Sequence, residues 1–322
     1  MVKAIVPEIS WERAGLGLLA GAVAAVYLLA ALGIGKVTLP RRTAAVPDFS
    51  EILKDLPRGE GGHHSARLLH DTFDRIGYRL DAVAGDGDPV PPILLARMPR
   101  DLAHLAPVDA RKRVFLQVIL PQVLHVNQSV LRDRARLLEI KERAPLEAGG
   151  DDAAWLAALS ERYAVAGDID RLLTRVDAIP VSLALAQAAE ESGWGTSRFA
   201  REGNALFGQW SFSGIGLVPV DAADKGHRVR SFATLVDAVR AYAHNLNTHR
   251  AYAEFRRLRA ALRAADGRAL DGEALAGSLG HYSERRDAYV DSLRSIIRAN
   301  NLRAFDAARL GEREATVAGA PY

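Results

Sequence analysis

The most informative part of the chain reads VSLALAQAAEESGWGTSRFAREGNALFGQW, from Val181 to Trp210. Pro180 suits the first turn of a helix and Gly193 is typical of a helix end, so we predict a helix over residues 180–192. The interior of this helix is mostly Ala and Leu, which indicates that it packs against other elements. Its last turn carries two glutamates, Glu190 and Glu191, and these are the first candidates for chemistry.

The two glutamates are expected to have different surroundings. Glu191 continues the helix face of Ala184, Gln187 and Ala188, because residues three, four and seven apart share a face. Glu190 points about 100° away, and we expect it to face solvent. Burial favours the protonated form of a carboxyl group, and glycosidic cleavage needs a protonated acid. Glu191 is therefore a candidate general acid; the alternative is an ordinary solvated glutamate at a helix end.

The segments on either side of this helix are mostly helical as well. The sequence predicts a small β-hairpin over residues 209–232, where Gly, Pro and alternating apolar residues are concentrated, and helices again after Thr234 and Ser283. Before Pro180, helical spacing predicts two apolar stripes, the first made by Trp155, Leu156, Leu159 and Tyr163, and the second by Ile169, Leu172, Leu173 and Val176.

Residues 48–150 form a first helical region, and APLEAGGDD over residues 144–152 is a plausible boundary after it. Its clearest element is a helix over about 109–143, which we expect Pro121 to kink or split.

An apolar segment near the N-terminus predicts a membrane anchor. The 22 residues Ala14–Gly35 carry no charge, and as a helix they would extend about 33 Å, enough to cross a bilayer. The segment is longer than the apolar part of a secretory signal, so we expect an uncleaved anchor; a buried core helix is the alternative. Two basic residues precede it and three follow, which favours a body on the inner side of the membrane; these are Lys3, Arg13, Lys36, Arg41 and Arg42.

Composition excludes several classes of site. The 322 residues contain 42 basic and 39 acidic side chains, and a net charge of +3 is too small to indicate a nucleic-acid partner. The absence of cysteine excludes disulfides, thiolate metal sites and cysteine nucleophiles. The histidines near residue 64 match no ligand spacing, so neither a metal nor a cofactor is expected. An exposed basic face is expected from Arg256, Arg257 and Arg259.

Two linked motifs resemble the glucosaminidase family, glycoside hydrolase family 73, and its membrane-anchored bacterial members in particular. The family signature Ala-x-x-Glu-Ser-Gly-Trp-Gly stands at Ala188–Gly195, and Asn-x-Leu-Phe-Gly follows at Asn204–Gly208. Further similarity lies at His244–Arg259 and His281–Ile297, and the resemblance covers about residues 90–305.

The resemblance implies a mainly α, lysozyme-like catalytic domain with a small β-hairpin lobe and a glycan cleft. It implies an endo-β-N-acetylglucosaminidase that cleaves the GlcNAc-β-1,4-MurNAc bond of peptidoglycan. Glu191 matches the general acid, and Tyr282 matches a tyrosine that supports substrate or intermediate. The substrate-binding candidates, for some of which packing is the alternative role, are Trp194, Asn204, Phe207, Gln209 and Trp210.

A second catalytic group is not identified by these motifs. A protein nucleophile requires two carboxyl groups about 5–5.5 Å apart, and inversion through water requires about 6.5–9.5 Å. The candidates are Asp221 and Asp224 in the turn of the predicted hairpin, with Glu202 a weaker one, and each is also an ordinary turn or surface residue. Assistance by the acetamido group of the substrate would need no second carboxylate.

The predicted organisation has four parts: an anchor and tether over 1–47, a helical accessory region over 48–150, the lysozyme-like domain over 151–310 and a disordered tail over 311–322. The expected partners are peptidoglycan strands and, through one N-terminal helix, the bacterial cytoplasmic membrane. Because peptidoglycan lies outside this membrane, we expect the body outside, against the count of basic residues. The alternatives in function are a lytic transglycosylase that forms 1,6-anhydro ends and a non-catalytic protein that binds peptidoglycan.

Overall fold

The computed structural model describes residues 64–143, 149–211, 217, 228–266, 270–311 and 316–318. Residues 47–322 form one compact unit, so the predicted accessory region and the predicted catalytic region share it. The described part of this unit is mainly helical, which confirms the predicted fold class; the likeness to lysozyme stays a prediction. The predicted membrane helix over 14–35 lies outside the described residues.

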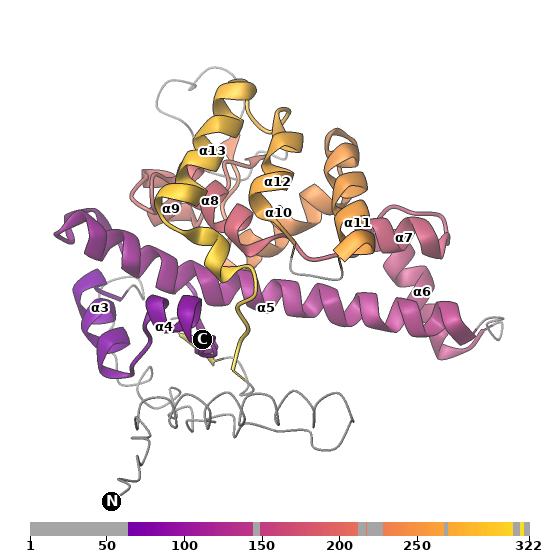
Figure 1. The fold of residues 1–322 in the computed structure, drawn as a ribbon, viewed down its shortest axis with the longest axis horizontal. Coiled ribbons are helices and arrows are strands. Elements are labelled where there is room, and N and C mark those ends of the chain that lie inside the picture. The colour runs from indigo at the N-terminus through magenta and orange to yellow at the C-terminus, as the bar shows by residue number, and fades with distance from the viewer. Residues whose placement is uncertain are drawn as a thin grey trace, which may run out of the picture. The chain divides into compact units, whose positions relative to one another are not determined.

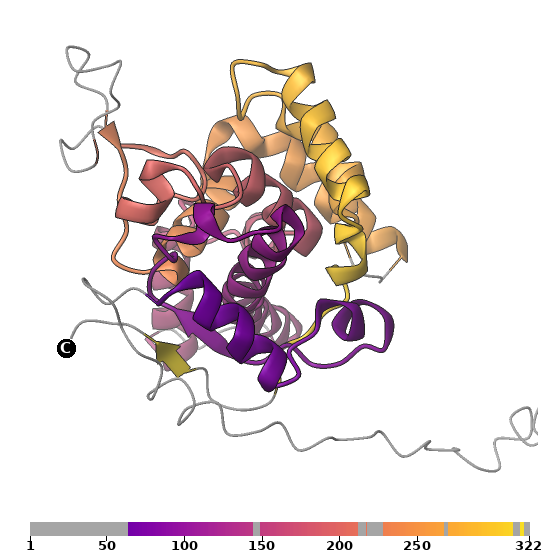
Figure 2. The same cartoon turned by 90° about the vertical axis from the view of Figure 1, so that its left-hand side faces the viewer.

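A single long helix, α5 (Val108–Arg143), runs through this unit (Figure 1). Figure 2 shows the molecule nearly along the axis of α5, and other helices lie around this helix on several sides. Its length and composition would allow it to cross a membrane, but most of its apolar part is buried inside the protein, as in a core helix. Pro121 does not split the helix, contrary to one of the two expected outcomes; it is buried within a continuous run of 36 residues.

The segment before α5 packs against it and pairs with the C-terminal end of the chain. The strand β1 (Ile93–Leu95) is parallel to β4 (Thr316–Ala318). The prediction of disorder after Gly311 is therefore wrong for residues 316–318, because the backbone of β1 offers hydrogen-bonding groups that a short strand can pair with. The helical elements of this segment are α3 (Ala66–Arg75), α4 (Leu80–Gly85) and the 3₁₀ turn η2 (Leu102–His104).

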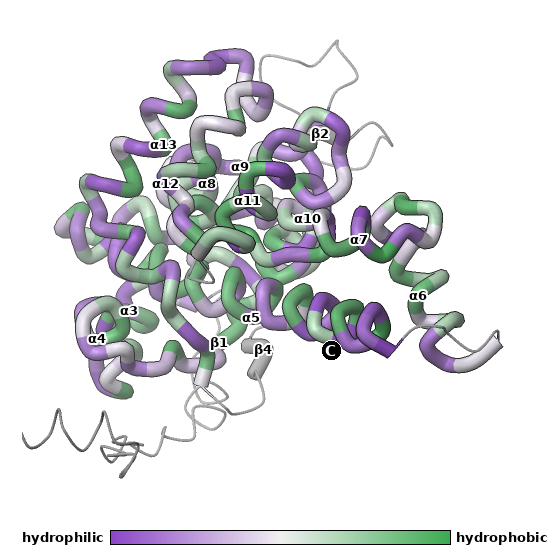
Figure 3. The backbone as a smooth tube through the Cα atoms, turned by 45° about the vertical axis from the view of Figure 1, so that its right-hand side comes forward, coloured by the Kyte–Doolittle hydropathy of each residue, from purple (hydrophilic) through white to green (hydrophobic). Residues whose placement is uncertain are grey.

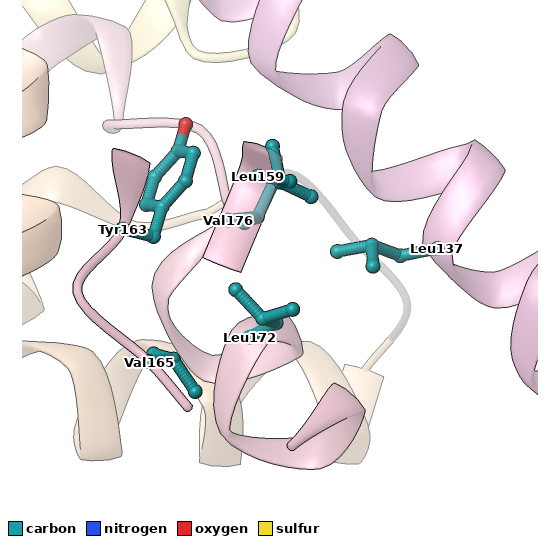
Figure 4. Packing of buried hydrophobic residues seen from close by; sticks show 6 residues of the cluster. All are labelled: Leu137, Leu159, Tyr163, Val165, Leu172 and Val176. Carbon is teal, nitrogen blue, oxygen red and sulfur yellow. The ribbon is translucent and has the colours of Figure 1, made fainter. Parts of the chain in front are cut away.

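The two apolar stripes predicted before Pro180 pack against the C-terminal half of α5. The first stripe lies on α6 (Asp151–Arg162) and the second on α7 (Ile169–Arg175). Each stripe also includes the residue that directly follows its helix. Asp168 caps the start of α7, because its carboxylate accepts a hydrogen bond from the backbone N–H of Arg171. Figure 4 shows the buried cluster that results, made by Leu137, Leu159, Tyr163, Val165, Leu172 and Val176.

The helix α8 (Val181–Ser192) is the predicted helix of the motif, and residues 181–189 are buried without a break. It packs against α5 and against the helices of the C-terminal third. In Figure 3 the outer helix α13 alternates between hydrophobic and hydrophilic residues, as expected for a helix with one face in the core. The elements after α8 are α9 (Arg198–Gly203), α10 (Leu235–Thr248), η4 (Arg250–Tyr252), α11 (Ala253–Asp266), α12 (Gly272–Ala276), η5 (Gly277–Leu279), α13 (Asp287–Ala299) and η6 (Leu302–Phe305).

The predicted hairpin is present at its base. β2 (Trp210–Ser211) and β3 (Arg228–Val229) are antiparallel, with Trp210 opposite Val229. Leu217 forms a further bridge with Val229. Asp221 and Asp224, the candidates for the second carboxylate, lie outside the described residues.

Buried polar contacts hold both the start of α8 and the segment that leads to it. The carboxylate of Asp306 accepts hydrogen bonds from the backbone N–H and the hydroxyl of Ser182, each 2.8 Å long. Arg259 is completely buried and donates to the backbone carbonyls of Asp177 and Ala178, 3.1 Å each. The prediction of an exposed basic face is therefore wrong for Arg259, because these carbonyls replace water as hydrogen-bond acceptors. It is also wrong for Arg256, which is 6% exposed and donates to the carbonyls of Leu246 and His249.

Candidate active site

The turn after α8 is built from the residues Ser-Gly-Trp-Gly of the motif. Gly193 ends the helix with φ of +57°, and the hydroxyl of Ser192 accepts a hydrogen bond of 2.8 Å from the backbone N–H of Gly195. A Cβ atom at Gly195 would lie 2.6 Å from Met98 and 2.9 Å from the ring of Phe115, so only glycine allows the turn to approach α5 this closely. These contacts fix the direction in which the last turn of α8 presents Glu191.

The second motif forms one wall beside Glu191. Asn204 adopts the left-handed conformation at the end of α9, and its side-chain amide donates to the carbonyls of Ala96 and Phe232, 3.1 Å each. Gly208 follows with φ of +60°, and a Cβ atom there would lie 2.8 Å from the Oε2 atom of Glu191. The backbone at Gly208 therefore lies directly against the carboxyl group.

Four tyrosines from the C-terminal third form the other side of the site. The rings of Tyr282 and Tyr289 are parallel, with centroids 5.7 Å apart, and the ring of Tyr252 lies 5.9 Å from that of Tyr282. The hydroxyl of Tyr282 donates to the carbonyl of Phe207 over 2.9 Å, which joins the tyrosines to the wall of the second motif. The fourth ring, that of Tyr242, stacks on Phe207 with centroids 3.9 Å apart.

A chain of side-chain hydrogen bonds joins Tyr242, Gln187 and Tyr289 beside Glu191. Tyr242 donates its hydroxyl hydrogen to Oε1 of Gln187 over 2.7 Å. Nε2 of Gln187 donates to the hydroxyl oxygen of Tyr289 over 2.9 Å. Tyr289 is in turn close enough to Glu191 to affect the pKa of its carboxyl group. Gln187 stands one helical turn before Glu191, so both side chains reach the same face.

Burial raises the pKa of the Glu191 carboxyl, and this is the largest effect on it. The neighbouring hydroxyl of Tyr289 acts in the opposite direction, the charge of Glu190 raises the pKa further, and Arg285 lowers it. The neighbouring Glu190 is not solvated as expected: its carboxylate accepts 2.8 Å hydrogen bonds from Arg285 and Ser292. The site thus holds one carboxyl group whose surroundings favour protonation beside another that is ion-paired.

This arrangement has the properties of a proton donor. A half-buried carboxyl with a raised pKa retains its proton closer to neutral pH than an exposed glutamic acid does. Of the four tyrosines beside it, only Tyr282 is more than slightly exposed, and an aromatic ring is suited to packing against the apolar face of a sugar.

Comparison with known proteins identifies the family. The family model described as "Glucosaminidase: Mannosyl-glycoprotein endo-beta-N-acetylglucosaminidase" matches residues 167–302. The chain is also 34% identical over 207 residues to "Protein bax" of Escherichia coli (strain K12), a match that covers 62% of this chain and 73% of that protein. The chain belongs to the glucosaminidase family. No solved structure matches it.

The residues predicted from the glucosaminidase motifs occupy different surroundings. Glu191 and Tyr282 are brought to the same cluster, as described above. Trp194 instead packs edge-on against Phe115, with centroids 5.6 Å apart, and the ammonium group of Lys112 lies 4.8 Å from the centroid of its ring. Trp194 was expected either to stack on sugar or to pack behind the helix of Glu191; these contacts favour packing, with α5 as the partner.

The remaining glucosaminidase candidates are mainly buried or lie at the hairpin. Asn204 and Phe207 are 2% exposed, so they shape the wall from within. Gln209 is half-buried, and its Oε1 atom has no hydrogen-bond partner among the described residues. Trp210 lies in β2, and its side chain is outside the description. Glu202 is exposed and pairs with Arg198 over 3.4 Å.

Sequence reasoning missed the participation of Gln187, Tyr242, Tyr252 and Tyr289. Tyr242 and Tyr289 face the core with their hydroxyl groups directed at polar partners. One signal was available, since Gln187 is a long polar side chain inside an otherwise apolar helix and stands four residues before the candidate acid.

Proposed function

We propose that this protein is a peptidoglycan hydrolase, an endo-β-N-acetylglucosaminidase in which Glu191 is the general acid. Membership of the glucosaminidase family supports glycosidase activity. The observation that carries the assignment of Glu191 is its half-buried position at the end of α8, where burial raises its pKa beside a cluster of tyrosines.

In this proposal Glu191 donates its proton to the oxygen of the bond between GlcNAc and MurNAc as that bond breaks. Tyr282 supports the sugar or the developing positive charge, because its ring is held in the cluster by stacking and by its bond to Phe207. Asp221, Asp224 or the acetamido group of the substrate supplies the second function. Gln209 and Trp210 contribute to binding from the start of the hairpin.

The decisive variant is Glu191→Gln, which keeps the size and loses the acid. We expect it to abolish release of soluble fragments from purified sacculi, with wild-type release by Glu254→Gln as the matched control for an exposed glutamate. Release by Glu191→Gln at the wild-type rate would refute the assignment. Mass analysis of the new ends separates the products: reducing GlcNAc supports the hydrolase, anhydro-muramyl ends indicate a lytic transglycosylase, and no new ends indicate a binding protein.

We further propose that residues 14–35 anchor the protein in the bacterial cytoplasmic membrane with its body on the outer face. The support is the uncharged length of this segment and the location of the proposed substrate. An alkaline phosphatase fused after Tyr322 is expected to be active in cells. An inactive fusion that is expressed at full length would refute this topology.

A further inference from the structure

We propose that Glu190 and Arg285 are positioning residues that hold Tyr282 in the site. The inference rests on the proposed function, in which Glu191 is the general acid and Tyr282 supports the sugar or its developing charge. It gives a role to the ion-paired glutamate beside the acid, which the proposed mechanism does not use.

The two carboxylate oxygens of Glu190 are bonded to two different parts of the chain. Oε1 accepts a hydrogen bond of 2.8 Å from the guanidinium group of Arg285, which lies in the segment before α13. Oε2 accepts one of 2.8 Å from the hydroxyl of Ser292, which lies on α13 itself. Because 18% of the Glu190 side chain is exposed and both oxygens are engaged, the carboxylate is a fixed partner for Arg285.

The turn that carries Arg285 needs such a partner. Residues 280–286 connect η5 to α13, and the backbone hydrogen bonds within this turn join residues three apart. Arg286 has φ of +46°, a conformation that a residue with a side chain keeps only where its surroundings impose it. Among the described residues, the hydrogen bonds from this turn to distant parts of the chain come from the side chains of Tyr282 and Arg285.

The bond from Arg285 to Glu190 complements the contacts of Tyr282. The hydroxyl of Tyr282 donates to the carbonyl of Phe207 over 2.9 Å, and its ring lies parallel to that of Tyr289, with an angle of 2° between the planes. These contacts fix the ring, whereas Arg285 fixes the backbone three residues further along. Tyr282 is the tyrosine of the cluster that keeps exposed surface, so its ring is the one that a sugar can reach.

The wall that receives Tyr282 is the same wall that lies against Glu191. A Cβ atom at Gly208 would lie 2.8 Å from Oε2 of Glu191, and the residue directly before it, Phe207, accepts the hydrogen bond from Tyr282. The end of α8, this wall and the turn before α13 therefore form a closed ring of contacts, and the ion pair is the link that closes it. Without this link the distance between the tyrosine and the acid is less well defined, and small misplacements of groups in a site reduce its rate.

The first test is spectroscopic and needs no substrate. The full-length protein is labelled with 3-fluorotyrosine, and the ¹⁹F signal of Tyr282 is assigned with Tyr282→Phe. Arg285→Ala should move this signal towards the position of free fluorotyrosine, and Glu190→Ala should move it in the same direction. The matched control is Arg298→Ala: this arginine lies on α13, has 67% of its side chain exposed and donates to Glu273 over 2.6 Å, so its removal should leave the signal unchanged.

The second test is kinetic, with soluble glycan strands of peptidoglycan as the substrate. Each kcat/KM is measured at the maximum of the variant's own pH–rate profile, because Glu190 and Arg285 also act on the pKa of Glu191. Arg285→Ala should lower kcat/KM by about fivefold, the upper range for an ion pair with an exposed partner. Arg285→Lys should recover part of this loss, since it keeps the charge and one hydrogen bond. In a Tyr282→Ala background, Arg285→Ala should cause no further loss, because Arg285 acts through that tyrosine.

An unchanged ¹⁹F signal in Arg285→Ala overturns the proposal. An equal loss of kcat/KM in Arg298→Ala overturns it as well, and so do losses that multiply when Arg285→Ala and Tyr282→Ala are combined. If Tyr282→Ala is too slow to measure, the ¹⁹F signal decides alone. Release by Glu191→Gln at the wild-type rate would instead refute the proposed function, and the ¹⁹F comparison would still test the positioning of Tyr282.

Discussion

Replacement of Gly195 by alanine should destabilise the protein through two separable effects. Gly195 has φ of +75°, and an alanine in this left-handed region costs about 1–2 kcal/mol. The added Cβ would also lie 2.6 Å from Met98 and 2.9 Å from the ring of Phe115. Met98 can move its terminal methyl group, but Phe115 is packed against Trp194, and overpacking of this kind costs about 1–3 kcal/mol. We expect a total loss of about 2–5 kcal/mol in the free energy of unfolding.

The matched control is Gly193→Ala, two residues earlier in the same turn. Gly193 also has a positive φ, +57°, but the nearest atom to an added Cβ is a hydroxyl at an ordinary 3.5 Å. This variant should lose only the conformational part, about 1–2 kcal/mol. Urea unfolding followed by tryptophan fluorescence measures both variants, because Trp194 packs on Phe115. Equal losses in the two variants would show that the turn does not approach α5 as described.

Two further predictions concern buried carboxylates. Asp177 is 2% exposed, accepts hydrogen bonds of 2.7 and 2.6 Å from Arg263, and lies 3.9 Å from the completely buried Arg259. Asp177→Ala should therefore cost about 3–5 kcal/mol in urea unfolding, because it leaves a buried guanidinium group without its counter-charge. Glu254→Ala, which breaks an exposed pair, should cost less than about 1 kcal/mol, and a similar loss in both variants would contradict this reasoning. Burial raises the pKa of Asp306 to about 6, from 3.8 for the free side chain. The folded state therefore binds this proton more tightly than the unfolded state does, and the free energy of unfolding should fall as pH rises from about 4 to 6. Asp306→Asn should remove this part of the pH dependence in urea midpoints measured across that range, and an unchanged slope would contradict it.

The predictable parts of the structure were those set by neighbouring residues. Pro180 and Gly193 mark the start and end of α8, and the alternation of Ala and Leu between them accounts for its burial. The two stripes on α6 and α7 followed in the same way from helical spacing. The face that carries Glu191 could be predicted because it depends only on the positions within one helix.

The parts that could not be predicted depend on residues far apart in the sequence. Tyr242 and Tyr289 lie 55 and 102 residues from Gln187, and no local pattern indicates that their hydroxyl groups meet its amide. Arg259 occurs in a charged helix, but its guanidinium group is buried because it donates hydrogen bonds to backbone carbonyls just before α8. Trp194 was compatible with either sugar binding or packing until α5 supplied Phe115 and Lys112 as neighbours.

The position of α5 separates the limits of the family match from the limits of folding. The family match starts at residue 167, yet α8 and α10 rest on a helix that ends at Arg143. A recombinant fragment cut at the family limits would present the apolar sides of both helices to water and should aggregate. Exchange of the family region between relatives by gene fusion therefore has to include the chain from Val108 onward, so that α8 and α10 keep the helix on which they pack.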